Sequence, residues 1–367
     1  MRIAIKLLSV LFLVCIHVLT GCATGQISSS ELSRAQENEA KKITLESVCE
    51  EILAMPEENI NLGKYVLLIT KCVYPEVNME NELKKIECMA AEIRPRLKGI
   101  AESQKIVEIL NKYFFDEMEF RGFTGNEGTP DSYFFHNALR QRKSHCLSSG
   151  IIYLVLAERL NLPVYGVLIP GHFFIRYDDG NTQINIDTTF RPGKNISDEE
   201  YLKILATRIK QTDMKIRRDF LTNLTKKEVL GAYLENTIVR KLRSGDDKNI
   251  PSALKYTDYV IRLFPNSYSG YCIRGGLLTL EKNHKQALEY YLKGYNLYPY
   301  DMSTIINLIR TYYELNNYRD CLDKIEELYK KYPPEIYELD NARIFSIISA
   351  TKKKCEEKLG IFFDLDK

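Results

Sequence analysis

Residues 144–188 read SHCLSSGIIYLVLAERLNLPVYGVLIPGHFFIRYDDGNTQINIDT, and this stretch holds the elements that decide the fold. Cys146 precedes an apolar run, residues 147–160, that is long enough and rich enough in helix formers to predict a buried helix. The thiol is therefore expected at a helix N-terminus. Unpaired backbone N–H groups and the positive end of the helix dipole favour the thiolate there, which makes a cysteine nucleophilic near neutral pH.

Two short strands are predicted after this helix, at residues 172–177 and 183–187. The Asp179-Gly180 pair between them is typical of a two-residue hairpin turn. With that turn, His172 and Asp187 are directly opposite each other, with Cβ atoms about 4.5–5.5 Å apart. A carboxylate at that range can hold an imidazole in one tautomer. Cys146, His172 and Asp187 are thus a candidate catalytic triad of nucleophile, general base and orienting carboxylate.

Each of these residues also has a structural interpretation. A single cysteine at the start of an apolar helix is often a small core residue, a histidine at a strand start is often structural, and an aspartate after a strand often caps a turn. The three together, in a register that pairs the last two, favour the triad. His145 adjoins the cysteine and cannot face the same side of a helix, so we interpret it as a structural or rim residue.

The sequence around the three residues resembles the transglutaminase-like superfamily, and in particular its SirB-type branch. The resemblance is carried by CLSS at 146–149, LPVYGV at 162–167, IPGHFFIR at 169–176 and Ile186-Asp187, with upstream support at 115–122, 131–133 and 139–143 and weaker support at 65–69 and 93–97. It covers roughly half of the chain. Many members of that branch have lost the cysteine, whereas this chain keeps it.

The resemblance implies an α+β fold of papain or transglutaminase type. A nucleophile helix would pack against an antiparallel sheet with strands at 164–168, 172–177 and 183–190. It also implies that Cys146 attacks an amide, that His172 protonates the departing amine, and that water or another amine resolves the thioester. The segment after the aspartate, TTFRP at 188–192, departs from the ending common in the branch.

The N-terminus has the form of a bacterial lipoprotein signal peptide, residues 1–21. Basic residues in 1–6 precede an apolar core at 7–20 and the motif Leu19-Thr20-Gly21-Cys22. Cys22 is the predicted site of lipid attachment, followed by a tether at 22–44. The apolar run is shorter than the roughly 20 residues of a membrane-spanning helix. We therefore expect a lipid-anchored protein of the bacterial cell envelope, at the outer membrane if the cell has two membranes.

Composition argues against nucleic-acid binding. Residues 1–21 hold two of the 51 basic residues and no acid, so the remaining chain balances 49 basic against 49 acidic residues. Neither the nine cysteines nor the five histidines show the spacing of a zinc site, and the sequence implies no metal and no cofactor. Some of the cysteines could pair in an exported chain, although buried free thiols are the simpler expectation.

The C-terminal third is predicted to contain tetratricopeptide repeats, at residues 231–340. Pro265, Pro299 and Pro333 are evenly spaced along the chain, and their spacing equals the period of this repeat. The residues expected to pack within the repeats are Tyr271, Gly275, Ala287, Tyr291 and Pro299. We expect a capping helix at 341–367, a helical lead-in at 45–112 and the transglutaminase-like core at 113–230, with a loop-rich segment at 113–143.

Two functions from different classes follow. In the first, the protein is a membrane-anchored cysteine hydrolase or acyltransferase that acts on a protein or peptide substrate. In the second, it is a catalytically silent adaptor that binds a protein partner through its repeats. Retention of all three triad residues favours the enzyme.

Overall fold

A computed structural model describes residues 43–123, 127–190, 192–208, 218–243 and 247–361. The predicted signal peptide, Cys22 and all but the last two residues of the predicted tether lie outside these ranges. Residues from Leu45 onward belong to one compact unit. No helix in the described part of the chain has the length and apolar character that a bilayer crossing requires.

The chain enters this unit through helices, as the expected lead-in at 45–112 predicts. They are α3 (Leu45–Ala54), α4 (Leu62–Lys71), α5 (Met79–Leu97) and α6 (Ser103–Asn111), with a 3₁₀ turn at Glu57–Asn59 and a π-helical turn at Lys112–Glu117. Asn61 and Asn78 cap α4 and α5 by accepting hydrogen bonds from backbone N–H groups three residues ahead.

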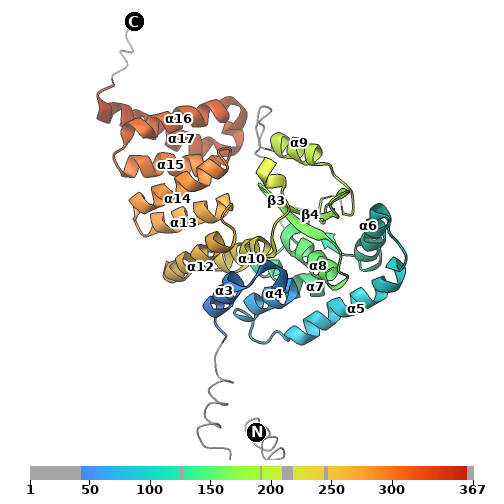
Figure 1. Ribbon diagram of the computed structural model, residues 1–367. Helices are drawn as coiled ribbons and strands as arrows, with labels where there is room; N and C mark the ends of the chain where they lie inside the picture. The colour runs from blue at the N-terminus through green and yellow to red at the C-terminus, as the bar shows by residue number, and fades with distance from the viewer. Residues whose placement is uncertain (1–42, 124–126, 191, 209–217, 244–246, 362–367) are drawn as a thin grey trace, which may run out of the picture. The chain divides into compact units, whose positions relative to one another are not determined.

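The central element is α8 (Cys146–Arg159), which begins at the cysteine as the sequence predicts. Every residue from Leu147 to Ala157 is buried, so the helix is covered on all sides. Gly150 allows α8 to pack closely against the sheet, because any side chain at this position would clash: a Cβ would lie only 2.5 Å from the Phe173 ring. Helix and strand therefore pack in direct contact (Figure 1).

The main sheet is antiparallel, with strand order β3 (Val164–Ile169), β4 (His172–Asp178) and β5 (Gln183–Ile186). Side chains from one face, including Phe173 and Ile175, join the core around α8. Side chains from the other face, including Phe174, pack with Tyr201 of α9 (Asp198–Arg208). The sheet is thus a middle layer between α8 and α9.

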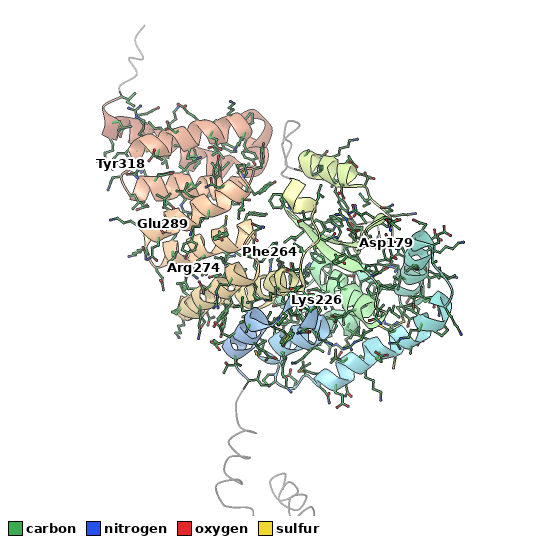
Figure 2. The ribbon with its side chains drawn as sticks, viewed as in Figure 1. Asp179, Lys226, Phe264, Arg274, Glu289 and Tyr318 are labelled. Carbon is green, nitrogen blue, oxygen red and sulfur yellow. The ribbon has the colours of Figure 1, made fainter. Side chains whose placement is uncertain are left out.

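The predicted hairpin register is wrong by two residues. Asp178 pairs with Gln183 and Ile175 with Ile186, so the loop holds four residues, 179–182, instead of two. The Asp179 carboxylate accepts hydrogen bonds from the N–H groups of Asn181 and Thr182, which stabilises the longer loop (Figure 2 labels Asp179). His172 and Asp187 are therefore not directly opposite each other, contrary to our prediction. Because side chains alternate with a period of two, the slip keeps side chains on the same face, and the two side chains still meet.

Two further expectations need correction. The third strand ends at Ile186 and not at residue 190, because the chain turns at Asp187. The segment 113–143 is more ordered than a loop. It contains a 3₁₀ turn (Pro130–Tyr133), α7 (Phe135–Gln141) and two short parallel strands, β1 (Arg121–Gly122) and β2 (Lys143–Ser144).

After a 3₁₀ turn (Arg218–Leu221) and α10 (Lys226–Leu234), the C-terminal part is helical. It continues with a π-helical turn (Glu235–Val239), α11 (Arg240–Arg243), a 3₁₀ turn (Asp247–Asn249), α12 (Ile250–Leu263), α13 (Tyr268–Leu280), α14 (His284–Leu297), α15 (Met302–Glu314), α16 (Tyr318–Lys331) and α17 (Pro334–Leu359). From α12 to α17 each helix packs on the next (Figure 1). The last helix begins at Pro334 and not at residue 341, since proline is well suited to a first helical turn.

These helices repeat with the period of the prolines. The interval from the start of α13 to the start of α15 equals the interval from the start of α14 to the start of α16, and both equal the spacing of the prolines. The predicted packing residues lie in or beside α13 and α14. Gly275 faces the ring of Tyr291, Ala287 is fully buried, and Tyr271 and Pro299 are half-buried.

Candidate active site

Cys146 is the first residue of α8 and is partly exposed. The backbone N–H groups of Leu147 and Phe173 both stabilise its sulfur as an anion. The first comes from the N-terminal turn of α8 and the second from β4, so the packing of helix on strand aims two donors at one thiol.

His172 is the first residue of β4, and it is almost completely buried. Its Nε2 atom lies 2.8 Å from Oδ2 of Asp187. Its Nδ1 atom makes no well-aligned hydrogen bond, and the Cys146 thiol lies within interaction range of the ring. Catalytic hydrogen bonds are often loose in the absence of substrate and tighten when it binds.

Asp187 is fully buried, directly after β5. Its Oδ1 atom accepts hydrogen bonds from the backbone N–H groups of Thr189 (2.8 Å) and Phe190 (2.7 Å). Its Oδ2 atom accepts one from the Tyr201 hydroxyl (3.2 Å) in addition to that from His172. These donors offset the cost of burying the carboxylate and fix its orientation.

Cys146 and His172 shift each other's pKa in the directions that a nucleophilic cysteine requires. Burial alone would raise the pKa of Cys146, but the hydrogen bond and charge of His172, with the Phe173 and Leu147 backbone, lower it below its ordinary value. Burial alone would lower the pKa of His172, but its hydrogen bond to the Asp187 carboxylate and the neighbouring Cys146 thiol raise it to about 9. Both shifts favour a thiolate–imidazolium pair.

His145 takes no part in this pair. Its ring stacks on Tyr133, with ring centroids 3.7 Å apart, and meets the edge of Phe123. Burial and the nearby Arg240 lower its pKa to about 4, so the ring is neutral near pH 7. This environment suits the structural role expected for it.

Two residues of the site were not anticipated from the sequence. Tyr201 donates to Asp187 from α9, and its ring stacks on Phe174 with centroids 4.0 Å apart. Phe190 packs on His172 with ring centroids 4.4 Å apart. Neither belongs to a recognisable motif, because the folded sheet and turn bring them to the site.

The described residues hold no group of three or more potential metal ligands. Two cavities lined by described residues, each about 570 Å³, lie away from Cys146. One lies at the far end of α8, beside Glu158 and Lys226, and the other lies between α6 and β5.

A cysteine at a helix N-terminus, a histidine at the start of β4 and an aspartate directly after β5 is the arrangement that the sequence resemblance led us to expect. Residues 80–235 match the family model described as Transglutaminase-like superfamily. The chain thus contains a transglutaminase-like domain, in agreement with the resemblance seen in the sequence, and the domain includes all three candidate residues.

Similar proteins are found in bacteria. A UPF0162 protein of Xylella fastidiosa is 23% identical over 253 residues, covering 68% of this chain and 88% of the relative. A UPF0162 protein of Buchnera aphidicola is 24% identical over 227 residues, covering 61% and 82%. A crystal structure of menin aligns with a TM-score of 0.38 and 12% identity, covering 85% of this chain and 98% of menin, a likeness too low to support an argument.

Proposed function

We propose that the protein is a cysteine-dependent amide hydrolase or acyl transferase that uses Cys146, His172 and Asp187. The observation that supports this proposal is the placement of Cys146, a partly exposed residue, next to a buried imidazole that is itself held by a buried carboxylate. A purely structural cysteine gains nothing from such partners. A nucleophile needs all of them.

The reaction follows from the protonation states of the pair. The Cys146 thiolate attacks the acyl carbon of an amide, and the His172 imidazolium gives its proton to the departing amine. The resulting thioester is resolved by water, which yields an acid, or by a second amine, which yields a new amide. Backbone N–H groups in the first turn of α8 have no intrahelical acceptors, which makes them candidate donors to the oxyanion.

The other parts of the chain complete the proposal. Helices α12 to α17 are proposed to be tetratricopeptide repeats, supported by their regular period and by the fit of Tyr291 against Gly275. They would hold a protein or peptide substrate. Lipid attachment at Cys22 would place the protein in the bacterial cell envelope. The neutral charge balance favours a protein partner over nucleic acid.

Thiol reactivity tests the catalytic proposal. The full chain is labelled at pH 7 with a limiting amount of iodoacetamide, and the rate at each cysteine is followed by peptide mass spectrometry. Cys88 is exposed and serves as the internal reference. An ordinary thiol is only about 3% thiolate at pH 7, so ionisation alone can accelerate Cys146 up to roughly 30-fold over that reference. We expect a large part of this acceleration.

His172→Ala should abolish the excess reactivity, whereas His284→Ala at the start of α14 should leave it unchanged. If Cys146 reacts no faster than Cys88 in the folded wild-type protein, the catalytic proposal is wrong. The protein would then be better described as an adaptor that binds partners through its helical repeats.

A further inference from the structure

Phe190 is a large apolar side chain that remains 55% exposed although it lies at the candidate site. Its ring centroid is 4.4 Å from that of His172, and the two ring planes are inclined by 38°. Burying an aromatic side chain is one of the strongest sources of apolar stabilisation available to a protein. An exposed ring beside a catalytic imidazole is therefore a natural contact for an apolar ligand group.

The backbone holds Phe190 in this position. Its N–H group donates to Oδ1 of Asp187 at 2.7 Å, next to the bond from Thr189. The carbonyl of Asp187 accepts a hydrogen bond from Gly193, which closes the turn behind the ring. The carboxylate that orients the imidazole thus also fixes the backbone that carries the exposed ring.

Two further aromatic rings lie near the imidazole. Tyr201 lies on the α9 side, with its ring centroid 5.9 Å from that of His172, and Phe174 lies between the sheet and α9. Both of these rings are buried, whereas Phe190 is open to solvent. Among the three rings described beside His172, Phe190 is therefore the one that a substrate can contact.

We propose that Phe190 is a specificity-determining residue that selects amides with an apolar or aromatic group next to the scissile bond. This inference rests on the proposed function, since it concerns the same site. It names the substrate class: the preferred substrate places a hydrophobic side chain or ring against Phe190 while its acyl carbon faces Cys146.

Two electrophiles that differ only by a ring provide the probe. Iodoacetamide and its N-phenyl derivative iodoacetanilide both alkylate thiols by displacement of iodide. The selectivity of Cys146 is its iodoacetanilide rate divided by its iodoacetamide rate, normalised to the same ratio at the exposed Cys88. This normalisation removes the intrinsic difference between the two reagents.

We expect the wild-type protein to favour the phenyl reagent and Phe190→Ala to reduce that preference by about two- to tenfold, the usual range for an aromatic contact. Phe190→Tyr keeps the ring and should keep the preference. Leu280→Ala removes a similarly exposed side chain at the end of α13 and should change nothing. Thermal unfolding curves verify that each variant is folded.

The results separate this inference from the proposal it builds on. A fast Cys146 whose selectivity is the same in wild type and Phe190→Ala overturns the role of Phe190 and leaves the catalytic proposal intact. A slow Cys146 whose selectivity still depends on the ring supports the apolar contact but refutes catalysis. Loss of selectivity in the Leu280→Ala control as well would show that the ratio does not report on the site, and would overturn the inference.

Discussion

Asp187→Asn is the substitution that best separates a working triad from three residues that merely lie together. The asparagine keeps Oδ1, which accepts from the Thr189 and Phe190 backbone, so the turn after β5 is retained. It replaces Oδ2, the atom that faces His172, with an amide that donates. The imidazole Nε2 must then accept, which places the ring proton on Nδ1 and removes the imidazolium.

The size of the effect follows from the structure. The pKa of His172 is raised from 6.5 to about 9, which corresponds to about 3 kcal/mol of preference for the charged ring. Asp187 makes the largest favourable contribution, and a charge-assisted hydrogen bond contributes about 1.5–3 kcal/mol. Losing it should reduce the thiolate–imidazolium population at least tenfold, and Cys146 alkylation at pH 7 should fall by about 10- to 30-fold.

The assay is the iodoacetamide rate at Cys146 between pH 5.5 and 9.5. In the wild-type protein the rate should be nearly constant around neutral pH, because the ion pair is already formed. In Asp187→Asn the rate should be low at pH 7 and rise with pH, as for an ordinary thiol. Asp258→Asn, on the exposed face of α12, is the matched control and should behave like the wild-type protein.

The reasoning is refuted if a folded Asp187→Asn variant alkylates at the wild-type rate with the wild-type pH profile. In that case Asp187 is a structural residue that caps the turn, and the lowered pKa of Cys146 does not depend on it.

Three further predictions concern the surroundings of the site and the repeats. Tyr201→Phe removes the hydroxyl that donates to Asp187 at 3.2 Å. We expect the alkylation of Cys146 to be two- to tenfold slower, which corresponds to the loss of about 0.5–1.5 kcal/mol. An unchanged rate and pH profile would contradict a positioning role for Tyr201. Cys146→Ser keeps the hydrogen bond to Asp187, which raises the pKa of His172. The stability that this bond contributes is full below pH 6.5 and is lost as the pH rises above that value. Urea unfolding of this variant should therefore show a falling free energy of unfolding across that range. The wild-type curve should be flatter, because the thiol's lowered pKa gives a contribution that grows as the pH rises. Gly275→Ala should lower the free energy of unfolding in urea by about 1–3 kcal/mol, because a Cβ there would lie 2.8 Å from the buried Tyr291 ring. Gly276→Ala in the same helix is the control: its Cβ would have a nearest contact of 3.7 Å, so its effect should be neutral or stabilising. Equal effects of the two substitutions would contradict this packing.

Local rules were sufficient for much of the fold. The apolar run after Cys146 predicted α8 with its first residue at the cysteine, because helix propensity and burial act over a few consecutive residues. Local patterns also predicted that β4 and β5 form a hairpin. The regular spacing of the prolines predicted the regular spacing of the C-terminal helices.

Local rules failed where the outcome depended on hydrogen bonds made by side chains. Asp179 accepts from two N–H groups and lengthens the hairpin loop to four residues, so the predicted register was wrong. Asp187 accepts from two more and ends β5 early, in the turn that carries Phe190. An Asp-Gly pair favours more than one loop length, and the choice is made by these side-chain contacts.

The sequence by itself therefore determined which residues could form a nucleophile, a base and an orienting acid, since residue type and periodicity are local properties. Tertiary structure alone decided that the imidazole has Asp187 on one side and the thiol on the other, that Tyr201 braces the carboxylate from α9, and that Phe190 stays exposed beside the ring. These contacts join segments that are far apart in the chain, from Cys146 at the start of α8 to Tyr201 in α9. Their geometry is set by how α8 and α9 pack on the two faces of one sheet, a relation that no local pattern encodes.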